Sequence, residues 1–438
     1  MQPFVRFIRF IRSIRRSLAG LVLVFSTLTL SVGVACGQAS APPIQLAQNI
    51  TDGCVIRGAY DPQQDYFPQK VDLDYSSAWN VEYYRNYKVI NVTNPWTGAS
   101  ETFQYVLVQC GTPAPSEEDY PDAQFIEVPI DTIVMLSTTY LPHLVDLEVL
   151  DSLVGIETID YVNSQEVIDR YHQGNIAEVG SGAGVNIEQI LDLDPDVVMA
   201  SGSGVPEYDT HPTLIENGIA AAINADWMEQ SPLGRAEWVK FTAMFYNREA
   251  QSSRLFDDIE QRYTDLMNQI QNVSDRPTVF NNLPWQGTWY VPGGQSFSAQ
   301  MMDDAGASYL WRDNNSTGSL ALDFEAVYER AIDADFWLIF GQGMQGIDDL
   351  VASDERFGDF TAVQRGRVYA NDARVNANGG NDYFESGVVN PDAVLADLVK
   401  IFHPELVPDH TLTYYRRLTP SSSDEFSSRI FLPLIKRQ

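Results

Sequence analysis

Two segments of the sequence carry side chains suited to binding a small molecule. Residues 378–383 read NGGNDY and combine side-chain amides, an accessible backbone and one aromatic ring, which together suit a flat, polar ligand. Trp285 and Trp289 lie on either side of Gly287 and could pack on a chelate or a macrocycle. Each feature has a structural alternative, because the first could be an ordinary turn and tryptophan is often part of a protein core.

Nucleophilic catalysis and direct metal binding find less support in the sequence. A serine nucleophile of the hydrolase kind sits in a Gly-x-Ser-x-Gly turn and is paired with a histidine. Residues 179–184 place Ser181 among glycines, but not at that spacing. The five histidines are scattered without the short spacings of metal ligands. We expect no catalysis, no metal site and no cofactor, keep an exported hydrolase as the alternative, and expect any iron to arrive already chelated.

The charge of the chain limits its partners. It has 59 acidic and 28 basic residues and a formal net charge of −31, which becomes −36 if the five arginines among the first 16 residues are removed. A surface of this charge repels the phosphates of nucleic acids, so nucleic-acid binding is not expected. Arg374 and Arg235 could each meet an anionic ligand, although a salt bridge is the alternative in so acidic a chain.

The first 36 residues predict export from the cytoplasm. The arginines are followed by an apolar run, residues 18–35, that ends in small residues, which is the pattern of a secretory signal peptide. Residues 33–36 read GVAC and resemble a bacterial lipobox in which Gly33 replaces the usual leucine. The resemblance implies a lipid on Cys36 and a protein held in the periplasm or on the outer face of the cytoplasmic membrane. The run of about 18 residues could also just span a bilayer as an uncleaved anchor.

The segment before residue 125 is predicted to be an extension that contains a β-hairpin. If Cys36 carries a lipid, Cys54 and Cys110 remain as a pair that could form a disulfide in an oxidising compartment, with two free thiols as the alternative. Residues 81–93 and 103–109 are rich in β-branched and aromatic side chains, and the turn sequence NPWTG separates them. This pattern predicts two antiparallel strands.

After about residue 131, short apolar strands alternate with helices, which predicts parallel sheets with helices on their faces. Residues 186–200 and 323–339 repeat one plan, in which a helix leads through an acidic turn into a strand. The repeat predicts two lobes of related α/β topology. The predicted strands lie near residues 133–136, 153–156, 197–200, 220–223, 279–280, 336–340 and 367–370.

A long helix is predicted between the two lobes. Ser231 is a candidate N-cap before Pro232, and apolar residues then recur at helical spacing between Leu255 and Ile270. A helix over residues 248–272 would be about 37 Å long and could join the lobes as a stiff spine. The predicted organisation is a signal peptide (1–35), an extension (36–124), a first lobe (125–230), a bridging helical segment (231–273), a second lobe (274–406) and a tail (407–438).

Six short motifs follow one another at characteristic distances between residues 125 and 406. They are VMLSTTY (134–140), NIEQILDLDPDVV (186–198), SPLGRAEW (231–238), WYVPGG (289–294), DAG (304–306) and AVQRGRVY (362–369). In this order they resemble the periplasmic substrate-binding proteins of ABC importers for iron complexes and cobalamin. The resemblance implies two Rossmann-like α/β lobes with parallel sheets, joined by one long α-helix, with a ligand in the cleft between them.

The same resemblance implies a monomer that performs no chemistry and delivers its ligand to an ABC permease and its ATPase. The implied ligand is an iron complex of the ferric siderophore kind, with cobalamin or haem as the alternative. A surface sensor that takes no part in transport is an alternative from another class.

The resemblance places the ligand at loops that follow the carboxyl ends of strands, as is general for open α/β sheets. It also implies one surface carboxylate on each lobe that docks to arginines of the permease, for which Glu207 and Glu325 are candidates, with a plain solvated carboxylate as the alternative. The predicted ligand-binding residues are Thr138, Thr139, Tyr140, Ser181, Gly182, Ser201, Trp285, Trp289, Gly293, Gly294, Arg374, Asn378, Asn381 and Tyr383.

Overall fold

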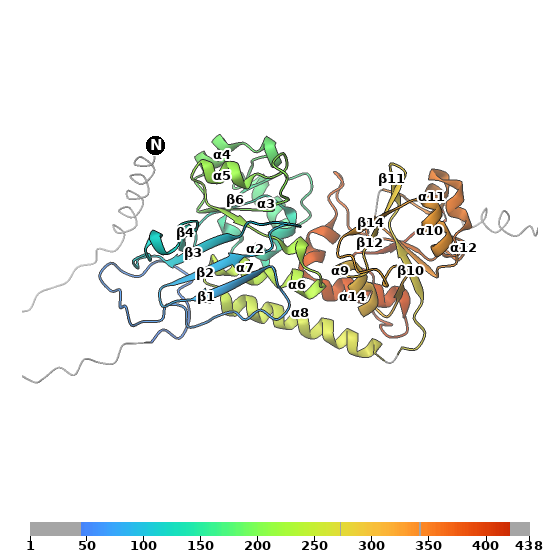
Figure 1. Ribbon diagram of the computed structural model, residues 1–438, viewed down its shortest axis with the longest axis horizontal. Helices are drawn as coiled ribbons and strands as arrows, with labels where there is room; N and C mark the ends of the chain where they lie inside the picture. The colour runs from blue at the N-terminus through green and yellow to red at the C-terminus, as the bar shows by residue number, and fades with distance from the viewer. Residues whose placement is uncertain (1–44, 272, 341–342, 421–438) are drawn as a thin grey trace, which may run out of the picture. The chain divides into compact units, whose positions relative to one another are not determined.

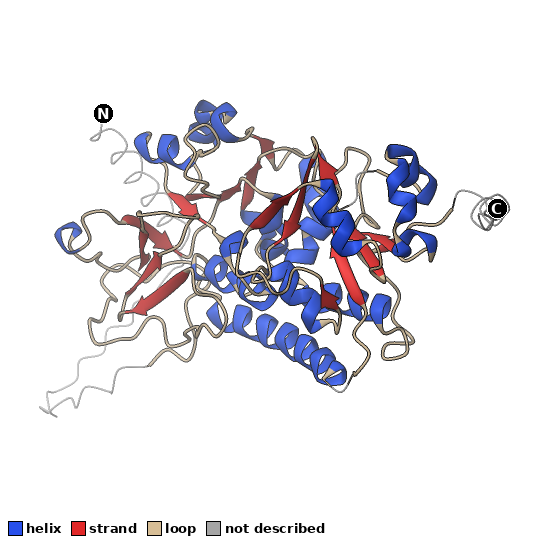
Figure 2. Cartoon of the chain, turned by 45° about the vertical axis from the view of Figure 1, so that its right-hand side comes forward, coloured by secondary structure: helices blue, strands red, loops and turns tan. Residues whose placement is uncertain are grey.

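The computed structural model describes residues 45–271, 273–340 and 343–420 (Figure 1). The predicted signal peptide and Cys36 therefore lie outside the described residues. Four β-sheets are present in the described part of the chain. Two of them are the main sheets of two α/β lobes, and Figure 2 shows helices beside the strands of each. None of the described helices combines the length and hydrophobicity needed to cross a bilayer.

The first lobe contains a five-stranded parallel sheet. Its strands lie in the order β7 (Ala177–Glu178), β6 (Leu153–Ile156), β5 (Ile133–Met135), β8 (Val197–Ala200) and β9 (Ala221–Ile223). All residues of β5, β8 and β9 are buried, as expected for parallel strands covered on both faces. The four strands predicted here are confirmed. The connecting helices are α2 (Leu141–Asp146), α3 (Gln165–His172), α4 (Ile187–Leu193) and α5 (His211–Glu216).

The second lobe repeats this arrangement. Its sheet has the order β13 (Ser308–Tyr309), β10 (Thr278–Asn281), β15 (Phe336–Ile339), β16 (Val368–Ala370) and β17 (Arg416–Arg417), with only β17 antiparallel to its neighbour. A small antiparallel sheet joins β11 (Pro284–Trp285), β12 (Thr288–Pro292) and β14 (Ser319–Leu322). The helices are α9 (Phe297–Asp304), α10 (Phe324–Ala331), α11 (Ile347–Ser353), α12 (Thr361–Gln364), α13 (Ser386–Val389) and α14 (Pro391–Phe402).

Part of the predicted tail belongs to the second lobe. β17 pairs with β16, and Tyr414, Tyr415 and Leu418 are buried in the same core as β10 and β15. Residues 407–420 contain no long apolar run, so the sequence does not predict the two-residue strand β17 or the burial of the neighbouring tyrosines.

The repeat seen in the sequence is also a repeat in three dimensions. Asn186 caps α4 in the first lobe and Asp323 caps α10 in the second, each accepting a hydrogen bond from a backbone N–H of its helix. At the end of each unit an aspartate, Asp196 or Asp335, accepts a hydrogen bond of 3.0 Å from the backbone N–H of a threonine at the start of the first strand of its lobe's main sheet, β5 or β10. The two lobes are therefore built on one local plan.

The bridging segment consists of α6 (Pro232–Ala236), α7 (Trp238–Met244) and α8 (Glu249–Ile270). Ser231 caps α6 through the Gly234 N–H, as predicted. Helix α8 has 22 residues, about 33 Å at 1.5 Å per residue, and it lies against α7 and α14 (Figure 1). Leu255 of α8 packs on the first lobe, whereas Phe256 and Tyr263 are buried in the second-lobe core. The predicted spine helix is confirmed.

The extension forms a four-stranded sheet. β1 (Trp79–Tyr83), β2 (Tyr87–Val92) and β3 (Phe103–Gln109) are antiparallel, and β4 (Gln124–Val128) is parallel to β3. The predicted hairpin is present as β2 and β3, but the first predicted strand, residues 81–93, is wrong as a single strand, because β1 ends at Tyr83 and the chain turns before β2 begins at Tyr87. Cys54 and Cys110 form the predicted disulfide.

Three buried glutamates of the first lobe and bridging segment hold the extension in place. Glu237 accepts hydrogen bonds of 2.7–3.0 Å from the backbone N–H groups of residues 74–76. Glu229 accepts hydrogen bonds of 3.2 Å from the N–H groups of residues 77 and 78. Glu249 forms a buried ion pair with Lys88 of β2. Apolar side chains of the extension share one core with the first lobe, so the extension is part of that lobe rather than a separate module.

Candidate functional site

The loop after β5 lies at the point where the strand order of the first sheet reverses. Open α/β sheets bind ligands at such a point. Thr138 and Thr139 are half-buried there, and the hydroxyl of Thr139 lies 2.9 Å from that of Ser137. Tyr140 is 2% exposed, and its hydroxyl donates a 3.2 Å hydrogen bond to the carbonyl oxygen of Asn224. The structure gives Tyr140 a packing role and leaves the two threonines at the edge of the sheet.

The loops after β7 and β8 are joined to each other. Ser181 and Ser201 are exposed, and the Thr210 hydroxyl donates a 3.2 Å hydrogen bond to the carbonyl oxygen of Gly182. Asp209 is buried and accepts hydrogen bonds of 2.7 and 2.8 Å from two backbone N–H groups of its own loop. These contacts fix two of the predicted ligand-binding loops as one unit.

Trp96, which sequence reasoning missed, packs against the loop after β8. It comes from the turn between β2 and β3 of the extension, is 7% exposed and lies over His211 with ring centroids 5.5 Å apart. A Cβ atom at Gly202 would lie 2.5 Å from the indole, and one at Gly204 would lie 2.6 Å from it. The two glycines of the SGSG sequence (201–204) could have indicated that another side chain packs closely against the backbone of this loop, but the local sequence does not indicate which side chain.

The two predicted tryptophans of the second lobe have different environments. Trp285 precedes a tight turn in which Gln286 and Gly287 both have positive φ, as a two-residue hairpin requires, and its side chain is 60% exposed. Trp289 is fully buried, packs on Phe280 and Trp337, and donates a hydrogen bond of 3.0 Å to the carbonyl oxygen of Asn281. Only Trp285 is accessible to a ligand in this structure.

The glycines after β12 serve backbone packing. A Cβ atom at Gly293 would lie 2.3 Å from the carbonyl oxygen of Ser316, and one at Gly294 would lie 2.2 Å from that of Asn314. Both glycines are buried. Their identity is explained by the neighbouring loop and does not require a ligand.

The loop after β16 contacts the first lobe directly. Asn376 donates hydrogen bonds of 2.9 Å to the carbonyl oxygens of residues 160 and 162, and Asn378 donates one of 3.0 Å to the Asp160 carboxylate. Glu385 is 2% exposed and accepts hydrogen bonds of 2.6 and 2.9 Å from the N–H groups of Asn163 and Ser164, just before α3. Burial raises the pKa of Glu385 above its ordinary value. The loop predicted to hold a ligand thus joins the two lobes.

The remaining predicted residues of this loop also have protein partners. Arg374 forms an ion pair of 3.0 Å with Asp382, which is buried. Asn381 donates a hydrogen bond of 3.1 Å to the carbonyl oxygen of Asn371 and accepts one from the Tyr383 N–H. Tyr383 itself is half-buried and packs on Tyr415.

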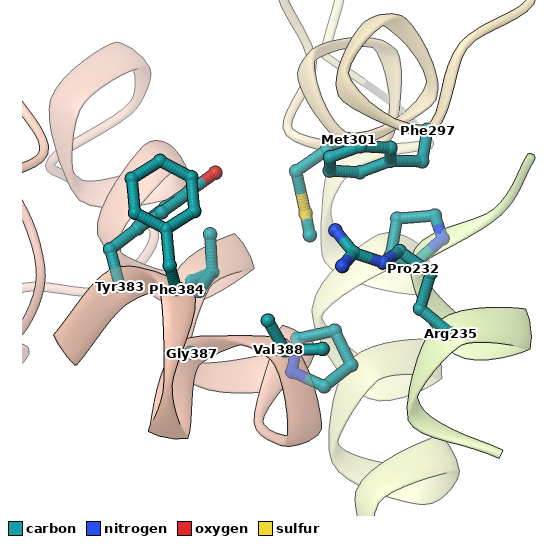
Figure 3. Close-up of a pocket in the computed structure, with 10 residues that line it drawn as sticks. Pro232, Arg235, Phe297, Met301, Tyr383, Phe384, Gly387 and Val388 are labelled. Carbon is teal, nitrogen blue, oxygen red and sulfur yellow. The ribbon is translucent and has the colours of Figure 1, made fainter. Parts of the chain in front are cut away.

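A cavity lies where the bridging segment meets the second lobe (Figure 3). Tyr383 and Phe384 face Arg235 of α6 and Phe297 of α9 across it. The Arg235 guanidinium lies over the Phe297 ring, 4.6 Å from its centroid, and pairs with Asp226 at 3.0 Å. The cavity measures about 30 Å³, whereas sites for drug-sized ligands measure about 300–1,000 Å³. A ligand of that size does not fit in this cavity as it stands in the structure.

The two predicted docking carboxylates differ in their structural setting. Glu325 lies in the first turn of α10 and is exposed. Glu207 is exposed in the loop after β8. Glu188 occupies the same place in α4 as Glu325 does in α10, two residues after the capping side chain. The internal repeat therefore relates Glu325 to Glu188.

Four of the five histidines have structural partners. The Nε2 atom of His403 lies 3.0 Å from the carbonyl oxygen of Gly306, and that of His410 lies 2.7 Å from the Asp397 carboxylate. Burial lowers the pKa of His143 to about 3, and its Nδ1 lies 2.8 Å from the Thr242 hydroxyl. His211 packs on Trp96. Within the described ranges, no three histidine, cysteine or acidic side chains are grouped so that they could hold a metal ion.

Comparison with known proteins gives relatives over most of the chain. An uncharacterized lipoprotein of Methanocaldococcus jannaschii is 28% identical over 357 residues, which are 76% of this chain and 82% of the relative. A second uncharacterized lipoprotein of that organism is 27% identical over 328 residues, 72% of this chain and 80% of the relative.

Solved structures share the fold. A possible iron-binding (periplasmic solute-binding) protein from Staphylococcus epidermidis has a TM-score of 0.50 and 18% identity, over 62% of this chain and 98% of its own. A periplasmic binding protein from Veillonella parvula has a TM-score of 0.50 and 13% identity, over 75% and 99% of the two chains. The model of the family described as periplasmic binding protein matches residues 133–375, more than half of this chain. The chain belongs to the periplasmic binding protein family.

Proposed function

We propose that this protein captures a small iron complex outside the cytoplasmic membrane and delivers it to an ABC importer. The observation that carries the proposal is the meeting of the two lobes at the carboxyl-end loops of their sheets, where residues 374–385 contact residues 160–164. Ligands of open α/β sheets bind at this edge. The family membership and the printed name of the Staphylococcus epidermidis structure support an iron complex as the ligand.

The ligand enters when the contact between the lobes opens. Helix α8 is continuous and is buried against both lobes, so opening is a small movement about the spine and the contact loops rather than a large hinge motion. Thr138, Thr139 and Trp285 then line the site from the two sides. Cobalamin and haem remain alternative ligands of the same site.

Binding can be measured through tryptophan fluorescence. Trp285 is 60% and Trp227 is 41% exposed at the carboxyl edges of the two sheets, so a chelate between the lobes should quench them. The mature protein is titrated with ferric trihydroxamates, haem and cobalamin. We expect one class to bind with a Kd below about 10 μM, near −7 kcal/mol, and Trp285→Phe to reduce the quenching. If no class binds at that strength, the proposal is wrong.

The protein acts by binding alone in this proposal. The recovered ligand should have its original mass and metal content after prolonged incubation with stoichiometric protein. Conversion of the ligand to product over many turnovers would contradict the proposal and favour an exported enzyme.

Attachment to the membrane is proposed to occur through Cys36. The lipobox-like sequence before it and the lipoprotein names of the two relatives support this assignment. The intact protein should partition with membranes, and the mass of its N-terminal peptide should include a diacylglyceryl cysteine. Cys36→Ser should either release the protein or leave it attached through an uncleaved leader, and a variant that stays on the membrane after its leader has been removed would contradict the assignment.

Docking to the permease is proposed to use Glu325 of the second lobe and Glu188 of the first. The pair replaces Glu207 as the first-lobe candidate because the internal repeat relates Glu188 to Glu325. Glu188→Lys and Glu325→Lys should each lower ligand uptake by cells while the Kd of the isolated protein stays unchanged. Glu207→Lys is the comparison, and a larger loss of uptake from this variant at unchanged Kd would favour Glu207 as the docking residue of the first lobe.

A further inference from the structure

Large apolar side chains are exposed at the carboxyl edges of both sheets. Tyr161, Tyr208 and Trp227 of the first lobe are 54%, 74% and 41% exposed, and Trp285 and Phe384 of the second are 60% and 43% exposed. The cavity in Figure 3 adds a lining that is mostly apolar. Aromatic rings gathered in this way at a binding site favour a ligand with apolar or flat surface.

Basic residues are scarce in the loops at these edges. The loops contain ten acidic residues but only two basic ones, Arg312 and Arg374. Opposed charges at a binding site raise affinity and association rates, and like charges lower them. The loops counted are residues 136–140, 157–164, 179–186, 201–210, 224–231, 282–287, 310–318, 343–346 and 371–385.

The arginines at these edges are each neutralised by an aspartate. Arg374 pairs with Asp382 at 3.0 Å, and Arg312 lies 3.8 Å from Asp303. Two further arginines reach the same edges from secondary structure. Arg235 of α6 pairs with Asp226 at 3.0 Å and Arg416 of β17 pairs with Asp372 at 2.6 Å. Guanidinium groups held in this way offer little attraction to an anionic ligand unless an existing ion pair is broken.

Several acids at the first-lobe edge have no such neutralising partner. Asp160 and Glu207 are exposed and Glu157 is half-buried. No lysine or arginine of the described chain forms an ion pair with any of the three. The potential at this edge of the site is therefore negative.

We infer that the ligand is an uncharged or positively charged complex with exposed apolar surface, and that anionic chelates are discriminated against. The inference rests on the proposed function and narrows the ligand class of the same site. A chelate that carries free carboxylates would meet unpaired acids and already paired arginines. A neutral complex would meet the aromatic rings without repulsion, and a cationic complex would in addition be attracted by the negative potential. Iron complexes, corrinoids and haem derivatives of either charge exist, so charge can be tested independently of scaffold.

The test uses pairs of ligands that share a scaffold and differ in charge. The pairs are a ferric trihydroxamate with a free amine and the same chelate succinylated, haem dimethyl ester and haem, and an amide corrinoid and its carboxylate counterpart. In whichever scaffold binds, we expect the member without free carboxylates to bind about tenfold tighter or more at low salt. That preference should shrink in about 0.5 M salt, where screening removes long-range attraction.

Each outcome of this titration decides a different claim. Equal or tighter binding of the carboxylate-bearing member overturns the inference on charge and leaves the proposed function standing. A preference that does not change with salt also overturns it, because shape would then be its cause. Absence of binding in all three pairs overturns the proposed function, and with it this inference.

Variants locate the effect at the first-lobe edge. Combined Asp160→Asn and Glu207→Gln should reduce the preference within a pair by about threefold or more. Glu216→Gln, at the exposed end of α5, is the matched control and should leave the preference unchanged. Because the readout is a ratio within one scaffold, any effect of Asp160→Asn on lobe opening cancels. An unchanged ratio in the double variant overturns the assignment to these acids.

Discussion

Replacing Glu385 by glutamine tests whether the loop after β16 holds the two lobes together. The Glu385 carboxylate is 2% exposed and accepts hydrogen bonds of 2.6 and 2.9 Å from the N–H groups of Asn163 and Ser164. Hydrogen bonds to a charged group contribute about 1.5–3 kcal/mol each. Glutamine keeps one acceptor oxygen and turns an NH2 group toward the other N–H. We expect the closed arrangement to lose about 2 kcal/mol, a factor of about 30 in the opening equilibrium.

Hydrogen exchange of the ligand-free protein measures this change directly. The amides of residues 163 and 164 should exchange about 30-fold faster in Glu385→Gln than in the wild type, while the amides of β8 keep their protection. Asp169→Asn is the matched control, because Asp169 is exposed on the same helix α3 and no contact with the second lobe involves it. Unchanged exchange at residues 163 and 164 would refute the reasoning. An equal loss of protection in β8 would refute it as well, because it would indicate global destabilisation.

Three further predictions concern stability, each measured by urea denaturation. Folding lowers the pKa of His143 from 6.5 to about 3, so its contribution to stability is present above pH 6.5 and is lost as the pH falls. The free energy of unfolding should decrease by about 2 kcal/mol between pH 7 and pH 5 for this reason. His143→Gln should remove this part of the pH dependence, and an unchanged dependence of stability on pH would contradict the assignment. Gly202→Ala should lower the free energy of unfolding by about 1–3 kcal/mol, because its Cβ would lie 2.5 Å from the indole ring of Trp96. Gly184→Ala, whose Cβ would have no atom within 4 Å, should lower it by less than about 0.5 kcal/mol. Equal effects of the two substitutions would be inconsistent with the packing of Trp96 on Gly202. Cys110→Ser opens a loop spanning 56 residues in sequence and should lower the free energy of unfolding by about 2–4 kcal/mol, a loss that reductant should reproduce in the wild type and not increase in the variant.

Much of the fold could be predicted because parallel strands and long amphipathic helices leave strong local patterns. The run at residues 197–200 is buried on both faces and is apolar throughout, so its strand appears in the sequence without knowledge of its neighbours. Helix α8 begins at Glu249 and ends at Ile270, close to the limits expected from its apolar spacing. The attachment of the extension could not be predicted, because it depends on glutamates at residues 229, 237 and 249 whose partners are distant in sequence.

The candidate site could be predicted as a set of loops but not as a set of accessible side chains. The positions of the loops follow from the ends of the strands, and those strands can be predicted from the sequence. Whether a side chain faces a ligand depends on packing between distant segments, which gives no periodic signal. Trp285 and Trp289 show the difference, since they are four residues apart and have exposed fractions of 60% and 0%. The residues around the two tryptophans are similar in composition and do not predict this difference in exposure. The difference follows from the register of β11, β12 and β14, which depends on the tertiary structure.

The contacts of the extension indicate which loops of the proposed site are held in place when the ligand enters. The glutamates that hold the extension belong to the first lobe and the bridging segment. In turn, Trp96 of the extension packs against Gly202 and Gly204 and holds the loop after β8 in place. The first-lobe side of the site is therefore held by its own loop contacts and by a second sheet. On the second lobe, residues 374–385 contact the first lobe mainly through side-chain hydrogen bonds. Those of Asn376 and Asn378 to residue 160 are exposed to solvent, whereas the Glu385 carboxylate is buried. Opening therefore breaks the contacts of this loop with residues 160–164 and leaves the internal contacts of the loop after β8 intact, which is why we place the gate at Glu385 rather than at the exposed loop after β8.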